Sequence, residues 1–309
     1  MLLNEEKYNS FNLELNKKIL KENCLPIQIV LDIDDVLATG FHSSNLQKLL
    51  EDHPYLKDFE DLNLLINAVF PHMIHPGAIE LIQWIFQIPN VNVSFFSSGE
   101  ETRNTAFVKE LLTLALGDSF DKIKDNIGVF SRQHLVVSKE EETKNQFKLF
   151  KIYHGSMKKD LSKILNIDNL DNAILIDDDS SYIACGQERN VMVVPGADEY
   201  PFYEFYRDAN EFPDCMEKNI LSMNHIFYIA GMLSRIFNTK NNCLADNLFC
   251  LQYKSNADGT HEYDGSIHNE LQFYLDGLSE LQKVNPKLEF YGGELANEHF
   301  TKASFTNKF

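Results

Sequence analysis

Four short apolar runs recur along the first two hundred residues, and each ends abruptly at a polar residue or at proline. The runs are rich in β-branched residues, which is typical of buried β-strands. They are Ile27–Leu31, Val91–Phe96, Ala173–Ile176 and Val191–Val194, followed by Asp32, Ser97, Asp177 and Pro195. Between them, apolar residues recur every three or four positions and predict helices. These helices are expected over Ile79–Phe86, Thr105–Leu116 and Asp160–Leu165.

This alternation of strands and helices predicts the fold class. It favours an α/β fold built on a doubly wound parallel sheet. In such sheets, ligands bind beyond the carboxyl ends of the strands. The polar residues that follow the strands, Asp32, Ser97 and Asp177, therefore mark the expected site.

The two ends of the chain show a different pattern. Residues 1–25 have the irregular apolar face of a polar helix, which Pro26 ends. After about Asn210 the alternation fades, and one face of a long helix is marked by Met216, Ile220, Met223, Phe227, Ala230, Leu233 and Phe237. A second helix is expected over His268–Val284, with a turn at Asn256–Gly259 between the two.

We therefore expect two regions. Residues 1–210 form the α/β core, with the chemistry within 27–196, and residues 211–309 form a mainly helical accessory region. The apolar face that starts at Met216 is expected to pack on the core. A partner protein docked on the C-terminal region is the alternative.

Composition narrows the function class. The net charge of −18 opposes binding to nucleic acid or anionic lipid, and no local basic patch offsets it. Five scattered cysteines without a CxxC pair indicate reduced thiols in a cytoplasmic protein. The start of the chain lacks signal-peptide character. The longest apolar stretch, Ile226–Leu233, is far shorter than the roughly 20 residues of a membrane span.

Two carboxylate clusters at strand ends carry the candidate chemistry. Asp32 and Asp34 follow one strand, and Asp177, Asp178 and Asp179 end another. Mg²⁺ prefers oxygen ligands, and a shared cation would join clusters that otherwise repel. Either cluster alone could be a solvated acidic turn. Together they predict a Mg²⁺ site, with the choice between Asp177 and Asp178 as the direct ligand left open.

The same segments offer the groups that phosphoryl transfer needs. Asp32 would attack phosphorus, and Asp34 would protonate the leaving oxygen and later take a proton from water. Ser97 and the backbone N–H of Ser98 would bind phosphate oxygens. A lysine, Lys158 or Lys159, would spread positive charge over the phosphate and the nucleophile.

Four segments in this order resemble the four motifs of the haloacid dehalogenase (HAD) superfamily. They are Asp32–Val36, Ser97, Lys159 and Asp177–Asp178. The chain most resembles the branch of the small carboxy-terminal-domain (CTD) phosphatases, through Ile74–Gly77, Phe96–Gly99, Val129–Arg132 and Lys159–Ser162. It departs from that branch in Val36, where threonine is commoner, and in lacking a proline after motif four. A weaker similarity joins it to HAD-type bacterial effector phosphatases that are delivered into host cells.

The resemblance implies a HAD-like, Rossmann-like core with a small cap, and a Mg²⁺-dependent phosphatase reaction through an aspartyl phosphate. It favours Lys159 over Lys158. It implies that Mg²⁺ binds Asp32 and the backbone carbonyl of Asp34, and that one of Asp177 and Asp178 contacts the ion directly and the other more distantly. The second aspartate, Asp34, favours phosphatases and phosphomutases over dehalogenases and ion-pumping ATPases, which lack it.

The short stretch between Asp32 and Ser97 bears on the substrate. It leaves room for a small cap, with one or two helices expected over Leu46–Phe70. A partly open site would admit a phosphorylated side chain of a protein, which could be phosphotyrosine, phosphoserine or phosphothreonine. Aromatic residues in Phe202–Tyr206 could line the opening, although packing is their commoner role. The alternatives are a small-metabolite phosphatase and a phosphate-binding module without turnover.

Overall fold

The computed structural model describes residues 26–40, 64–66, 71–137, 157–195, 219–239 and 243–306. The expected N-terminal helix at 1–25, the aromatic segment at 202–206 and the region boundary near 210 lie outside the described residues.

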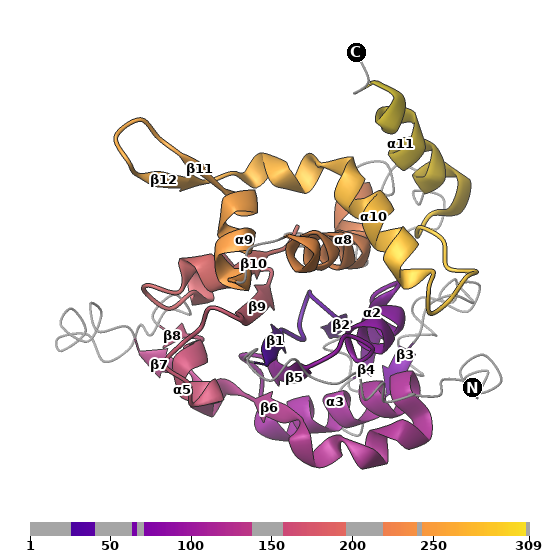
Figure 1. Cartoon of the computed structure of the whole chain (residues 1–309). Helices are drawn as coiled ribbons and strands as arrows, with labels where there is room; N and C mark the ends of the chain where they lie inside the picture. Colours follow the sequence, from indigo (N-terminus) through magenta and orange to yellow (C-terminus); the bar gives the residue numbers. More distant parts are fainter. Residues whose placement is uncertain are drawn as a thin grey trace.

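A five-stranded parallel sheet flanked by helices forms the centre of the molecule (Figure 1). Its strands are β1 (Ile27–Leu31), β5 (Val91–Phe96), β6 (Gly128–Phe130), β9 (Ala173–Asp177) and β10 (Val191–Val193). The order is β10-β9-β1-β5-β6, so the chain builds outward from β1 first on one side and then on the other. The α/β prediction is confirmed. The direction reverses between β1 and β9, which is where such sheets bind ligands.

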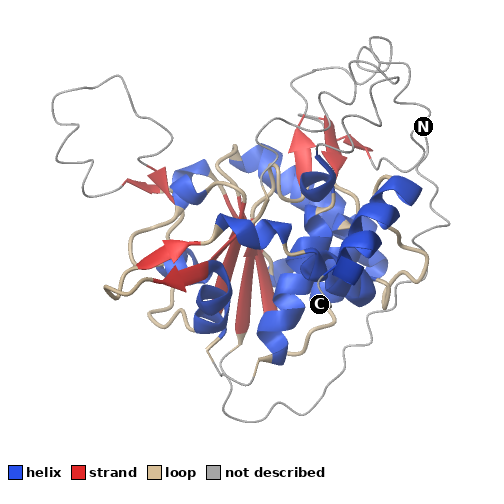
Figure 2. Ribbon diagram, turned by 90° about the horizontal axis from the view of Figure 1, so that it is seen from above, coloured by secondary structure: helices blue, strands red, loops and turns tan. Residues whose placement is uncertain are grey.

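Both faces of the sheet are covered, as Figure 2 shows. Successive residues of β1 point to opposite faces, so Ile29 and Leu31 enter the larger hydrophobic core and Val30 enters the smaller one. The larger core contains α2 (Ala78–Ile85) and α3 (Glu101–Leu116), and the smaller one α5 (Leu161–Leu165). Short 3-10 helices join these elements at Gly117–Lys122, Lys124–Asn126, Arg132–His134, Ser180–Tyr182 and Glu188–Asn190.

Within the first two hundred residues, two small antiparallel sheets stand apart from the central sheet. One contains β2 (Ala38–Gly40), β4 (Pro71–Ile74) and β3 (Leu64–Ile66), in the order β2-β4-β3. Leu64–Ile66 is therefore a strand, and the expectation that this part of 46–70 is helical was wrong, because pairing with β4 overrides the local pattern. Residues 46–63 and 67–70 lie outside the described residues. The other sheet pairs β7 (Val136–Val137) with β8 (Met157–Lys158).

The C-terminal region is mainly helical. Its elements are α8 (His225–Asn238), α9 (Leu244–Gln252), β11 (Tyr253–Ser255), β12 (His261–Tyr263), a 3-10 helix (Gly265–Asn269), α10 (Leu271–Leu281) and α11 (Gly293–Thr306). The two predicted helices are confirmed as α8 and α10, and the predicted turn joins β11 to β12. One helical turn precedes α8. Helices α9 and α11 were not predicted.

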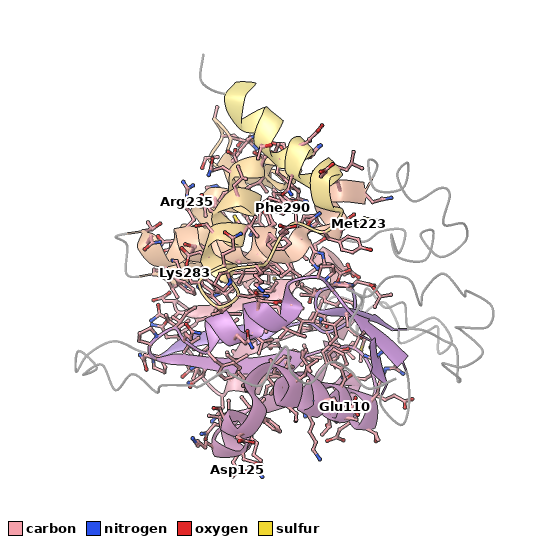
Figure 3. All side chains as sticks on the ribbon, turned by 90° about the vertical axis from the view of Figure 1, so that its right-hand side faces the viewer. Glu110, Asp125, Met223, Arg235, Lys283 and Phe290 are labelled. Atoms are coloured by element: carbon pink, nitrogen blue, oxygen red, sulfur yellow. The ribbon has the colours of Figure 1, made fainter. Side chains whose placement is uncertain are left out.

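The C-terminal helices share the larger core with the sheet. Met223, Phe227 and Leu233 of the predicted apolar face are buried in that core, which confirms that this face packs on the α/β core. Figure 3 shows the C-terminal helices, in orange and yellow, on one side of the α/β elements, in purple. The backbones of α8 and α10 approach closely: a Cβ atom added at Gly231 would lie 1.9 Å from the carbonyl oxygen of Phe273. Among the described residues, no helix is long and apolar enough to cross a membrane.

Candidate active site

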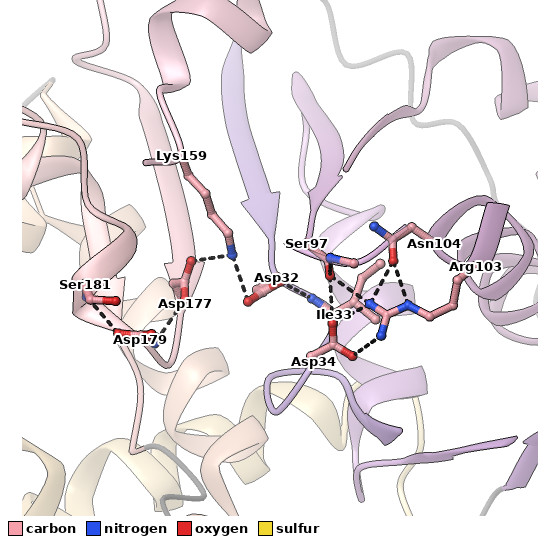
Figure 4. A network of polar contacts seen from close by, with 11 residues as sticks. Asp32, Ile33, Asp34, Ser97, Arg103, Asn104, Lys159, Asp177, Asp179 and Ser181 are labelled. Carbon is pink, nitrogen blue, oxygen red and sulfur yellow. Dashed lines mark hydrogen bonds and ion pairs between the residues drawn. The ribbon is translucent and has the colours of Figure 1, made fainter. Parts of the chain in front are cut away.

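Three side chains from three segments meet at the carboxyl ends of β1 and β9 (Figure 4). Leu31 pairs with Ile176, so the next residues, Asp32 and Asp177, lie on adjacent strands. Lys159 Nζ lies 2.8 Å from Asp32 Oδ2 and 2.7 Å from Asp177 Oδ2, and its side chain is fully buried. A single ammonium therefore bridges the two carboxylates.

The segment that follows β8 fixes Lys159. The backbone N–H of Lys159 donates to the carbonyl oxygen of Tyr182 at 2.8 Å, and the Lys159 ammonium lies 5.1 Å from the centre of the Tyr182 ring. The next residue, Asp160, caps α5 by accepting from Ser162 N–H. Lys158 points elsewhere: it is partly exposed and its Nζ donates to the carbonyl oxygen of Ser181. Of the two candidate lysines, Lys159 is the one beside the carboxylates.

Asp178 completes a group of carboxylates that fits a metal ion. Oxygen atoms of Asp32, Asp177 and Asp178 all lie within 4.8 Å of one another. Three carboxylates face one ammonium, an excess of negative charge that a divalent cation would neutralise, and all donors are the hard oxygens that Mg²⁺ prefers. Asp179 is outside the group, because its side chain accepts from Ser181 N–H at 2.8 Å.

The electrostatics reflect this crowding. Burial raises the pKa of Asp32 well above its usual value, with Lys159 opposing and the neighbouring carboxylates adding to the rise. Burial, Asp177 and Asp35 raise the pKa of Asp178 to about 7. Burial alone would lower the pKa of Lys159, but Asp177 and Asp32 raise it, so the ammonium stays charged. The three carboxylates therefore outweigh the single positive charge of Lys159.

Asp34 faces a second set of polar groups. Ser97 Oγ donates to Asp34 Oδ2 at 2.7 Å and accepts from Gly99 N–H at 3.0 Å. Arg103, from the first turn of α3, forms a two-pronged ion pair with the Asp34 carboxylate, with Nη1 to Oδ1 at 2.9 Å. Burial would raise the pKa of Asp34, but Arg103 and Ser97 together hold it below its usual value. The expected proton donor is thus an ion-paired carboxylate in this state.

The loop after Asp34 is held by histidines from two distant elements. His225 Nε2, on α8, lies 2.7 Å from the carbonyl oxygen of Val36, and His75 Nδ1 lies 3.1 Å from the same oxygen. Thr39 Oγ1 lies 2.9 Å from His75 Nε2. Burial lowers the pKa of His75 well below its usual value, and His225 adds to the effect. The C-terminal region therefore contacts the loop that carries Asp34.

The predicted residues fall into two neighbouring groups. Asp32, Lys159, Asp177 and Asp178 lie together, while Ser97 lies with the Asp34 side chain. Arg103 and His225 were not predicted. A basic residue in the first turn of a helix opposes the helix dipole, and that was the one sequence signal for Arg103.

Comparisons with known proteins give little beyond this geometry. No protein-family model matches the chain, and no curated protein matches its sequence. Among solved structures, a variant of the fission yeast RNA polymerase II CTD phosphatase Fcp1 bound to beryllium fluoride is similar over 86% of this chain and 68% of that chain, with 11% identity and a TM-score of 0.37. A second Fcp1 structure is similar over 86% of this chain and 67% of that chain, with 11% identity and a TM-score of 0.36. These low TM-scores support no argument about function.

Proposed function

We propose that the chain is a Mg²⁺-dependent phosphatase of HAD type, which hydrolyses a phosphomonoester through an aspartyl phosphate on Asp32. The observation that carries the proposal is the buried Lys159 ammonium between Asp32 and Asp177, with Asp178 beside them. That arrangement holds a carboxylate nucleophile next to a fixed positive charge at the ligand-binding edge of the sheet.

The proposed reaction has two steps. In the first, an Asp32 oxygen forms a bond to phosphorus while the bond from phosphorus to the leaving oxygen breaks. Asp34, which is an ion-paired carboxylate before substrate binds, first takes up a proton from solvent and then gives it to that oxygen. In the second, water attacks phosphorus, Asp34 takes the proton of that water, and inorganic phosphate leaves as Asp32 is restored. Ser97 and the N–H of Ser98 would bind phosphoryl oxygens.

Lys159 has the clearest electrostatic task. Its ammonium would offset repulsion between the Asp32 carboxylate and a phosphate dianion, and its burial strengthens that attraction. Mg²⁺, when bound by Asp32, Asp177 and Asp178, would neutralise charge on the phosphoryl group. The excess of carboxylates over ammonium groups supports this assignment.

We extend the proposal to a phosphoprotein as the substrate. The Asp34 side chain is 32% exposed, so a residue on the surface of another protein could reach it. Phosphopeptides that carry phosphotyrosine, phosphoserine or phosphothreonine should therefore be hydrolysed faster than sugar phosphates and nucleotides. Preferential hydrolysis of the small metabolites would contradict this part of the proposal and leave the phosphatase reaction standing.

The reaction itself is tested with an aryl phosphate and Mg²⁺. Asp32→Asn should abolish hydrolysis while far-UV circular dichroism stays unchanged, because an amide cannot act as the nucleophile. Wild-type protein quenched during turnover should carry a phosphoryl label that hydroxylamine removes, and the variant should carry none. Asp276→Asn, at a surface ion pair with Arg235, is the matched control and should keep full activity. Turnover retained by Asp32→Asn would refute the mechanism.

A further inference from the structure

Arg103 is a cation at the site for which the reaction above has no task. Its Nη1 and Nη2 both contact the Asp34 carboxylate, and Nη2 also donates to Ser97 Oγ at 2.9 Å (Figure 4). The arginine side chain is 17% exposed, whereas that of Lys159 is fully buried. Arg103 therefore contacts the buried, expected phosphate-binding serine and is itself partly exposed to solvent.

The guanidinium is held in place by groups other than Asp34. Its Nε donates to Asn104 Oδ1 at 3.0 Å, and the buried Asn104 in turn donates to Ser131 Oγ at 3.0 Å. It also lies close to Gly99, where an added Cβ atom would be 2.0 Å from Nη2. These contacts would keep the guanidinium beside Ser97 when the Asp34 carboxylate is exchanged for another anion.

The charges at the site indicate which anion that is. Lys159 contacts Asp32 and Asp177, so it acts on the nucleophile's side of an incoming phosphate dianion, and the oxygens on the side of Ser97 need a second cation. Among the described residues, Arg103 is the other cation that forms an ion pair with a site carboxylate. A guanidinium binds two oxygens of a phosphate in the same two-pronged way as two oxygens of a carboxylate.

We propose that Arg103 is a substrate-binding residue. When substrate binds, its guanidinium releases the Asp34 carboxylate and binds two oxygens of the substrate's phosphoryl group. The exchange leaves Asp34 facing the leaving oxygen. Without substrate, the ion pair keeps both side chains in position. This role rests on the proposed function, but it concerns binding and can be measured without turnover.

The test is calorimetric titration with inorganic phosphate, together with the KM for an aryl phosphate, in the presence of Mg²⁺. Arg103→Ala should raise the Kd for phosphate and the KM by at least about ten-fold, and Arg103→Lys should bind nearly as poorly, because a lysine lacks the two-pronged fork. Added guanidinium ion should partly restore phosphate binding to Arg103→Ala, which a purely structural role would not produce.

Two further variants make the result specific. Gly99→Ala retains the arginine but displaces its guanidinium, so it should weaken phosphate binding in the same direction. Arg235→Ala removes an arginine from a remote ion pair with Asp276 and should bind phosphate as the wild type does. Phosphate affinity within about two-fold of wild type in Arg103→Ala would overturn the proposal. A wild-type protein that binds phosphate through Arg103 but hydrolyses no phosphomonoester would refute the proposed function instead.

Discussion

At the scale of single residues, neighbours in the sequence have different surroundings. In the run of three aspartates, Asp177 bonds to Lys159, Asp178 joins the carboxylate group, and Asp179 accepts from the backbone of Ser181. The strand ends at Asp177, so the chain turns and sends the following side chains in different directions. The three residues are identical in type, and only their contacts in the folded chain assign them different roles.

Substitution of these aspartates gives a matched pair for metal binding. Asp178→Asn should weaken Mg²⁺ binding by at least about ten-fold, a cost of about 1.4 kcal/mol, because it removes a charged ligand. Asp179→Asn should leave the affinity within about two-fold. Titration calorimetry at about pH 8 suits this comparison, because the pKa of Asp178 is about 7 and metal ligands must be deprotonated. Equal losses in both variants would refute the assignment of Asp178.

The residues that the sequence predicted are those that local rules place. A polar residue after a buried parallel strand must lie at the ligand-binding edge, which brings Asp32 beside Asp177. The choice of Lys159 over Lys158 came from the family resemblance, since helix-start rules do not separate the two. Arg103 contacts Asp34 across 69 positions and His225 contacts Val36 across 189, and no periodicity encodes contacts at such distances.

At the scale of elements, strands with β-branched residues were predicted to within a residue, because burial on both faces of a parallel sheet leaves a continuous apolar run. Strand β5 matches its predicted range, Val91–Phe96. Strand β6, only Gly128–Phe130, was missed because so short a run carries no pattern. Leu64–Ile66 was misassigned because its strand exists only through pairing with β4.

The contact between α8 and α10 depends on glycine. A Cβ atom at Gly277 would lie 1.7 Å from the carbonyl oxygen of Phe227, a backbone atom that cannot move without shifting α8. Alanine normally stabilises a helix relative to glycine by about 0.5–1 kcal/mol. Here Gly277→Ala should instead destabilise the protein by about 1–3 kcal/mol, because overpacking outweighs helix propensity.

Urea unfolding, followed by far-UV circular dichroism, measures this effect. Gly265→Ala is the control in the same region, since its Cβ atom would meet only a Tyr263 ring carbon at 3.8 Å. That variant should change the free energy of unfolding by no more than about 0.5 kcal/mol. A stabilised Gly277→Ala protein would mean that the two helices do not pack as closely as described.

At the scale of the whole molecule, the two predicted regions meet in one core. Residues of β1, α2 and α3 belong to the same buried cluster as those of α8, α10 and α11. His225 extends the contact to the loop that carries Asp34. The expected division into 1–210 and 211–309 therefore remains a statement about sequence pattern, and whether the parts unfold separately is an experimental question.

The single tryptophan is well placed to answer it. Trp84 lies on α2, its Nε1 donates to Glu280 Oε2 of α10 at 3.2 Å, and its ring packs near Phe237 of α8. Its fluorescence therefore reports on the contact between the regions, whereas far-UV circular dichroism reports on all helices. Because the core is shared, we expect the two signals to give the same urea midpoint.

Gly277→Ala strengthens this comparison. If the core is one cooperative unit, the substitution should lower both midpoints together, although the substituted residue lies on α10 and most of the dichroism signal comes from elsewhere. A fluorescence transition at lower urea than the dichroism transition would contradict the expectation. It would mean that the C-terminal helices detach from α2 while the sheet stays folded, and that residues 211–309 form an accessory unit with a stability of its own.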